Sequence, residues 1–206
     1  MSDKRLPHDP FNVIITGVGG QGNVLASRVL GSMLVDKGFF VTIGETFGPS
    51  QRGGSVMSHL RISKMSVWSP QMPGFRAHII ASLEPIEAIR VLALYGNPEA
   101  TILCNTRPIY PVPVIRGEEE YPSMETIRKE LRSLVPDTLF IDATEEAQKL
   151  GSPILANIIM LGAVCGTGVF PVDRHDFRTT ISERVKRDQV DINISAFDIG
   201  AGLVPA

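Results

Sequence analysis

Apolar positions along the chain follow two spacings in turn, and this alternation predicts strands and helices that succeed one another. Short apolar or β-branched runs, which are typical of buried strands, occupy residues 13–16, 39–43, 55–63, 77–83, 101–105 and 138–142. Apolar residues at helical spacing occupy residues 23–37, 84–94, 123–134, 144–150, 153–164 and 173–185. The order favours a three-layer α/β domain with a mostly parallel sheet and a Rossmann-like start.

One strand departs from the parallel pattern. Apolar and polar side chains alternate along residues 55–63, with Val56 and Leu60 on one face and Met57 and His59 on the other. No helix separates this run from the strand before it, and a parallel neighbour would need such a crossover. We therefore expect a half-buried strand that forms an antiparallel excursion within the sheet.

Two segments lack a regular pattern. Three prolines within residues 108–114 indicate an extended segment, because proline breaks helical hydrogen bonding. The tail, residues 190–206, is half apolar without clear caps, so we expect its residues 192–204 to form an exposed surface that a partner covers. Residues 1–11 are interpreted as a polar tail, and residues 12–206 as a single domain.

Composition narrows the class of protein. The chain has 206 residues and a formal net charge of −2, which argues against binding to nucleic acid through phosphate neutralisation. Cys104 and Cys165 lie in apolar surroundings and lack a C-x-x-C partner, so we expect buried thiols and no iron–sulfur or zinc site. The start is polar, and glycines break the longest apolar stretch, residues 154–170. We expect a cytoplasmic protein that does not contact a membrane.

A glycine loop directly follows the first strand and precedes the first helix, and its sequence is Gly17-Val18-Gly19-Gly20-Gln21-Gly22. Glycines in such a turn allow positive φ, and the helix start offers unpaired N–H groups to an anion. A second glycine loop, residues 48–54, carries Arg52. The planar guanidinium of Arg52 suits a phosphate, and the alternative is that Arg52 is an exposed loop arginine without a ligand. The candidate phosphate-binding residues are Gly17, Gly19, Gly20, Gln21, Gly22, Ser50, Arg52, Gly53 and Gly54.

Other chemistry finds less support in the residues. A Rossmann dinucleotide site fits the first loop, with Glu45 placed to bind a ribose hydroxyl, but no pair of residues for hydride transfer accompanies it. A Walker A loop is excluded because Asn23 follows Gly22. The histidines are scattered, and no serine has a nucleophile-elbow context. A non-catalytic binding subunit, an autonomous NAD(P)-dependent reductase and a structural module that binds no ligand remain as hypotheses.

Several motifs together resemble a known family. The two glycine loops, followed by Ser58-His59-Leu60-Arg61, resemble the gamma subunit or domain of 2-oxoacid:ferredoxin oxidoreductases. The turn at residues 81–88 is similar to the strand-to-helix turn of that family. Residues 157–163, with Pro171-Val172-Asp173 behind them, are similar to its penultimate helix. The resemblance covers about residues 12–185, and the length is most similar to the small beta subunit of the indolepyruvate enzymes.

The resemblance implies a subunit of a larger enzyme. Such a complex decarboxylates a 2-oxoacid, here indolepyruvate or a pyruvate-like acid, reduces ferredoxin and forms an acyl-CoA. Thiamine diphosphate and iron–sulfur clusters are expected on partner subunits, which would also determine the choice of 2-oxoacid. This chain would aid assembly and bind coenzyme A, and an isolated chain could form a homodimer. Gly19, Gly20, Gln21 and Gly22 would face the diphosphate or adenine side, and Arg52 with Gly53 would replace the lysines of the pyruvate enzymes.

Overall fold

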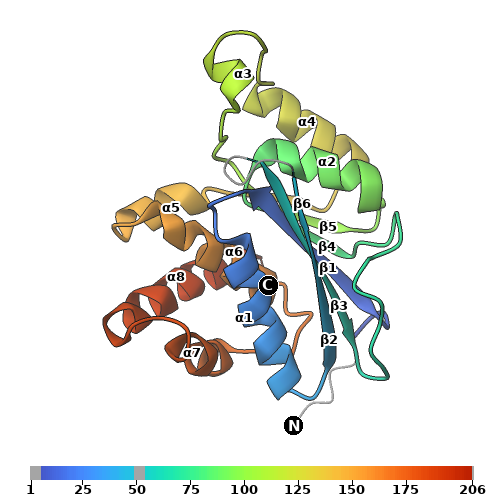
Figure 1. Ribbon diagram of the computed structural model, residues 1–206, viewed down its shortest axis with the longest axis vertical. Coiled ribbons are helices and arrows are strands. Elements are labelled where there is room, and N and C mark those ends of the chain that lie inside the picture. Colours follow the sequence, from blue (N-terminus) through green and yellow to red (C-terminus); the bar gives the residue numbers. More distant parts are fainter. Residues whose placement is uncertain (1–5, 49–53, 206) are drawn as a thin grey trace.

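A computed structural model describes residues 6–48 and 54–205, and it shows a mixed sheet between two layers of helices (Figure 1). Within these ranges the sheet has six strands in the order β2-β3-β1-β4-β5-β6. The strands are β1 (Phe11–Val18), β2 (Phe40–Phe47), β3 (Ser55–Ser63), β4 (Ile79–Ser82), β5 (Thr101–Asn105) and β6 (Thr138–Ile141). β1, β4, β5 and β6 are parallel, whereas β3 is antiparallel to both β1 and β2. The predicted α/β fold with an antiparallel excursion is confirmed.

The helices divide unequally between the two faces of the sheet (Figure 1). They are α1 (Asn23–Asp36), α2 (Pro85–Tyr95), α3 (Val112–Ile115), α4 (Met124–Leu134), α5 (Ala143–Lys149), α6 (Ala156–Gly166), α7 (Arg174–Ser182) and α8 (Val190–Gly202). α1 and α6 pack against one face with α7 and α8 behind them, and their apolar side chains form the larger buried cluster. α2 covers the opposite face with α4 behind it, over a smaller cluster.

β3 is more deeply buried than its alternating sequence predicts. Every residue from Ser58 to Ser63 is buried, so the expectation of a half-buried strand is wrong. The face that carries the polar side chains is covered by the connection to β4. There the Arg61 guanidinium carbon lies 5.0 Å from the centre of the Trp68 ring. On the same face, His59 packs edge-on against Tyr95 at the end of α2. Burial lowers the pKa of both Arg61 and His59. Arg61 also donates hydrogen bonds to Asn12 Oδ1 and to two carbonyl oxygens of the connection, those of Ser69 and Gln71.

The proline-rich segment contains a helical turn, although we expected an extended segment without a helix. In α3 the N–H groups of Ile115 and Arg116 donate to the carbonyl oxygens of Pro111 and Val112. Pro111 is the N-cap and Pro113 lies within the first turn, where a helix needs no N–H donor. The prolines therefore start this turn instead of preventing it, and the prediction for residues 108–114 is wrong at its end.

The C-terminal tail is a packed helix, which contradicts the expectation of an exposed apolar surface at residues 192–204. Ile194, Ala196 and Phe197 of α8 are buried, and the Phe197 ring stacks on Phe177 of α7 at 4.3 Å. α8 also lies directly against α6, because a glycine allows each backbone to approach the other. A Cβ built at Gly200 would lie 1.8 Å from the Ile159 carbonyl oxygen. The chain itself covers the tail, so the tail is part of the fold.

We predict that Gly200→Ala lowers the free energy of unfolding by about 1–3 kcal/mol, because the added methyl group must push α6 and α8 apart. Gly202→Ala in the same helix is the matched control, since a Cβ there meets no atom within 4 Å. Urea unfolding followed by circular dichroism measures both variants. Equal stability of the two would contradict the close packing of α8 on α6.

Candidate anion-binding site

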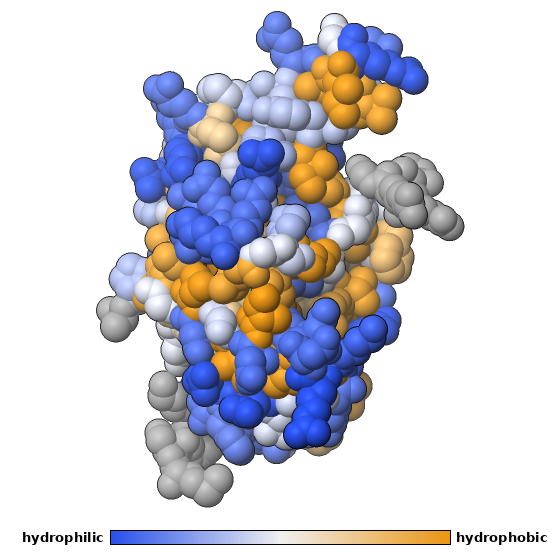
Figure 2. Space-filling view, turned by 90° about the vertical axis from the view of Figure 1, so that its left-hand side faces the viewer, coloured by the Kyte–Doolittle hydropathy of each residue, from blue (hydrophilic) through white to orange (hydrophobic). Residues whose placement is uncertain are grey.

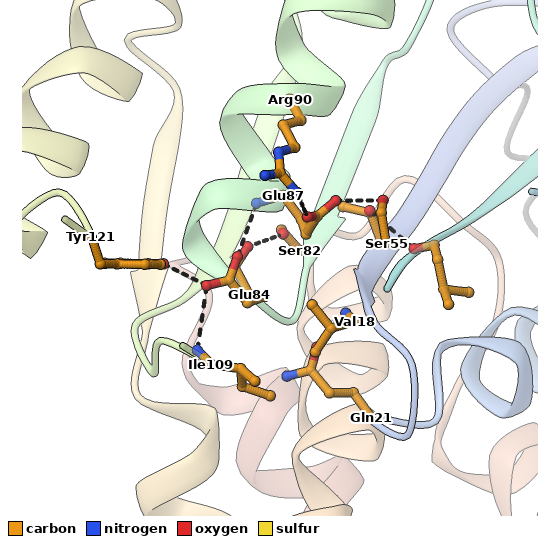
Figure 3. A network of polar contacts seen from close by, with 11 residues as sticks. Val18, Gln21, Ser55, Ser82, Glu84, Glu87, Arg90, Ile109 and Tyr121 are labelled. Atoms are coloured by element: carbon orange, nitrogen blue, oxygen red, sulfur yellow. Dashed lines mark hydrogen bonds and ion pairs between the residues drawn. The ribbon is translucent and has the colours of Figure 1, made fainter. Parts of the chain in front are cut away.

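The sheet changes its direction of winding between β1 and β4. The chain leaves β1 for α1 on one face, and it leaves β4 for α2 on the other face. The carboxyl ends of these parallel strands therefore open a crevice between the two connections, which is where α/β sheets bind ligands. Figure 3 shows this edge, with Val18 at the end of β1 and Gln21 in the β1–α1 loop on one side and Glu84 at the start of α2 on the other.

The structure brings the two predicted glycine loops together at this edge. The N–H of Gly19 donates to the carbonyl oxygen of Gly54 over 2.8 Å. β3 makes this contact possible because it runs antiparallel beside β1, so that its first residue, Ser55, is paired with Val18. Of the second loop's candidates, Ser50, Arg52 and Gly53 lie outside the described residues.

Gln21 holds the first loop in shape. Its Oε1 accepts the N–H of Val18, and its Nε2 donates to the Leu83 carbonyl oxygen, both over 2.8 Å. A Cβ at Gly17 would lie 2.5 Å from that Oε1, so Gly17 makes room for the glutamine. Both atoms of the Gln21 amide are therefore hydrogen-bonded to the protein itself. The sequence of the loop alone did not reveal these contacts.

Gly20 and Gly22 keep the features of an anion site. Their φ angles are +101° and +85°, and their N–H groups have no hydrogen-bond acceptor among the described residues. Both residues lie at the N-terminus of α1, where the helix dipole favours negative charge. The buried Asn23 follows them, and neither atom of its amide has a hydrogen-bond partner in the described part of the chain.

The Leu83 carbonyl oxygen, just after β4, links the β1–α1 loop to the end of β5. Besides Gln21, it accepts a hydrogen bond from Asn105 Nδ2 at the end of β5 over 2.9 Å. The Asn105 amide also bonds to Thr144 of α5, through Nδ2 to the hydroxyl and through Oδ1 to the backbone N–H. Asn105 is fully buried, so these polar contacts fix the floor of the crevice.

Two cavities at this edge differ in charge. The first, here called the glycine-loop cavity, has a volume of about 470 Å³. Gly20, Gln21, Arg107, Thr144 and Gln148 line it together with apolar side chains, and none of the described residues that line it carries a carboxylate. Arg107 forms no ion pair or side-chain hydrogen bond with the described residues.

The second, here called the Glu84 cavity, has a volume of about 250 Å³. Among the described residues, its lining includes the carboxylates of Glu84, Glu87, Glu119 and Glu120 but a single cation, Arg90. The glycine-loop cavity is therefore the one of the two that suits an anion. Sequence reading missed Arg107, because this arginine lies far from either glycine loop in the chain.

Glu84 organises the wall between the two cavities (Figure 3). Its carboxylate caps α2 by accepting the N–H of Glu87, and it also accepts the Tyr121 hydroxyl and the N–H of Ile109. Burial raises the pKa of Glu84, and these hydrogen bonds to the charged form oppose the rise. Glu87, also buried, accepts hydrogen bonds from Ser55 and Arg90.

The geometry around Glu45 differs from that of a dinucleotide fold. β3 lies between β2 and β1, which places Glu45 two strand spacings, about 10 Å, from the first strand. The carboxylate of Glu45 pairs with Arg28 at 3.3 Å. A ribose hydroxyl bound at the first glycine loop would therefore not meet this acid.

The cysteines and histidines do not form a reactive or metal site in the described part of the chain. Cys104 and Cys165 are buried as expected, and burial raises the pKa of each thiol to about 12. Residues 6–48 and 54–205 contain no group of three or more histidine, cysteine or acidic residues that could hold a metal. Within the same ranges, every helix is too short or too polar to cross a bilayer.

The family model for pyruvate ferredoxin/flavodoxin oxidoreductase matches residues 12–203. The chain belongs to this family. The indolepyruvate oxidoreductase subunit IorB of Pyrococcus horikoshii is 36% identical over 191 residues, which cover 92% of this chain and 94% of that protein. The resemblance inferred from the motifs is confirmed, and the chain is a small subunit of a 2-oxoacid:ferredoxin oxidoreductase.

Solved structures share the fold. The pyruvate oxidoreductase subunit PORC of Thermotoga maritima superposes with a TM-score of 0.69 at 19% identity, over 95% of this chain and 97% of that one. The 2-oxoglutarate:ferredoxin oxidoreductase of Magnetococcus marinus, solved with 2-oxoglutarate, coenzyme A and succinyl-CoA bound, gives a TM-score of 0.71 at 16% identity. The match covers 95% of this subunit but 31% of that chain, so the same fold also occurs as part of a longer polypeptide.

We predict that Gln21→Glu destabilises this oxidoreductase subunit by about 1–3 kcal/mol. A carboxylate still accepts from Val18, but it cannot donate to the Leu83 carbonyl oxygen and repels it instead. Gln148→Glu is the matched control, because Gln148 is exposed at the mouth of the glycine-loop cavity and forms no side-chain hydrogen bond within the described residues. Unfolding in urea near pH 7 compares the variants, and equal losses would show that Gln21 does not hold the loop.

Glu84 should make stability depend on pH. Because its folded-state pKa is raised above the ordinary value of 4.5, its contribution to stability is present below that pH and is lost as the pH rises through the folded pKa. The wild type should therefore lose stability relative to Glu84→Gln as the pH is raised from 4.5. Tyr121→Phe removes a hydrogen bond to the charged form and should extend this loss to higher pH. Urea unfolding across this range measures both effects, and parallel curves for all three proteins would refute the assignment.

Proposed function

We propose that this subunit holds the nucleotide part of coenzyme A in the glycine-loop cavity of a 2-oxoacid:ferredoxin oxidoreductase complex. The observation that carries the proposal is the chemistry of the cavity lining. It combines the unpaired N–H of Gly20 and the cation of Arg107 with a complete lack of carboxylates in the described lining. A phosphate-bearing ligand needs this balance of charge.

The residues present fit the parts of coenzyme A. The N–H groups of Gly20 and Gly22 suit the diphosphate, and Arg107 suits a further phosphate. Pro108, Pro153 and Ile154 give flat apolar walls for the adenine ring. Gln21 contributes by holding the loop, and the N–H of Gly19 is occupied by Gly54.

The second glycine loop would complete the clamp. The carbonyl oxygen of its last residue, Gly54, accepts a hydrogen bond from the N–H of Gly19. The hydroxyl of the next residue, Ser55, donates a hydrogen bond to Glu87. Both contacts place the loop's exit beside the first loop. Ser50, Arg52 and Gly53, which lie outside the described residues, would supply further donors to the phosphate oxygens.

The complex would decarboxylate indolepyruvate or a pyruvate-like 2-oxoacid to an acyl-CoA and reduce ferredoxin. Support comes from the name of the Pyrococcus relative and from the coenzyme A bound in the Magnetococcus enzyme. Coenzyme A supplies the thiol that receives the acyl group. Thiamine diphosphate and the iron–sulfur clusters would lie on partner subunits, while this chain binds and orients coenzyme A and aids assembly.

We expect Arg107→Ala to weaken coenzyme A binding by about tenfold, because it removes a charge-assisted hydrogen bond to a phosphate. Titration calorimetry on the assembled complex measures the affinity. Arg187→Ala is the matched control, since Arg187 is an exposed arginine that, among the described residues, forms no ion pair and lines neither cavity at this edge. Dephospho-coenzyme A, which lacks the 3′-phosphate, should bind the wild type and Arg107→Ala with similar affinity if Arg107 recognises that group. Unchanged affinity of Arg107→Ala for both ligands would refute the site.

A further inference from the structure

The segment between β5 and α4 displays apolar side chains to solvent. Ile109, Tyr110, Val112 and Ile115 are 39%, 53%, 57% and 72% exposed. α3, which this segment contains, reads Val-Pro-Val-Ile and has no buried residue. Figure 2 shows the hydrophobic patch at the top of the molecule over α3, with hydrophilic side chains beside it. A helical turn without a polar face is unusual in water, and such patches mark interaction surfaces.

The segment is held in one position, so the patch is a built surface. Glu84 accepts the N–H of Ile109 at one end of the segment and the Tyr121 hydroxyl at the other. The Tyr110 ring packs edge-on against Tyr121, with ring centroids 5.2 Å apart. These contacts present the apolar side chains to solvent instead of folding them into the core.

The charges beside the patch indicate what covers it. After α3, Arg116 and Gly117 lead to the three acidic residues Glu118, Glu119 and Glu120. Among the described residues, Arg116 pairs only with the first of them, at 3.9 Å. A complementary surface would be apolar and edged with basic side chains. A second copy of this chain, docked through the same patch, would bring two acidic triplets together, and like charges oppose such a pairing.

The patch also adjoins the proposed ligand site. Ile109 lines both the glycine-loop cavity and the Glu84 cavity. A subunit seated on residues 109–120 would therefore reach the mouth of the crevice, where an acyl group must pass between coenzyme A and the catalytic partner.

We infer that residues 109–120 are the docking surface for the large, thiamine-bearing subunit of the complex, whose matching surface is apolar with a basic rim. This inference rests on the proposed function, which supplies the partner. It replaces the C-terminal tail as the apolar surface that assembly covers.

The test is the affinity between this chain and its large subunit, measured by biolayer interferometry with separately purified chains. Ile115→Asp should weaken binding by about 100-fold, because it places a carboxylate at the centre of the contact. Its melting temperature should not change, since α3 buries nothing in the free chain. Met65→Asp is the matched control, because Met65 is 79% exposed on the connection after β3, away from the patch. The double variant Glu119→Lys, Glu120→Lys should slow association at low salt by about tenfold.

The outcomes separate the two proposals. If the wild-type chain does not bind the large subunit, the proposed function fails and this inference fails with it. If the wild type binds and Ile115→Asp binds equally well, the docking surface alone is wrong. If the isolated chain is a dimer by light scattering and Ile115→Asp makes it monomeric, a second copy occupies the patch and the inference is overturned.

Discussion

The arrangement of the carboxyl edge depends on one backbone acceptor, the carbonyl oxygen of Leu83. It accepts hydrogen bonds from the side-chain amides of Gln21, in the loop after β1, and Asn105, at the end of β5. Leu83 and Asn105 are buried and Gln21 is half-buried, and breaking the bond to Leu83 would leave the Gln21 amide nitrogen without a partner among the described residues. The acceptor thereby fixes the distance between the glycine loop and α5, and the glycine-loop cavity is the space that remains between them.

A second constraint divides this edge by charge. Glu84 and Glu87 concentrate negative charge on the side of α2, whereas Arg107 and the N-terminus of α1 leave the other side positive. The segment after β5 separates the two regions and is tied to Glu84 through Ile109 and Tyr121. The same carboxylate thus shapes the wall of the ligand cavity and positions the apolar patch that we assign to the partner.

The sequence predicted the fold better than the site, and the reasons are physical. Periodicity locates strands and helices because it reports which face is buried, and the missing crossover helix correctly identified β3 as antiparallel. It could not show that the glycines of α6 and α8 allow close contact between the two helices, nor that Pro113 lies in the first turn of α3. The glycine loop was recognised from its spacing, but Arg107 depends on a contact between distant segments. Gln21 was predicted from the motif to face a ligand, yet its side-chain amide forms hydrogen bonds with Val18 and Leu83.

The central claim is that the glycine-loop cavity binds coenzyme A, and backbone amide chemical shifts test it most directly. In the complex with its large subunit, coenzyme A should shift the amide signals of Gly20, Gly22 and Thr144, which lie at or beside that cavity. Signals of Glu87 and Arg90 in the Glu84 cavity should stay in place. Shifts confined to the Glu84 cavity, or none in this subunit at saturating coenzyme A, would contradict the account.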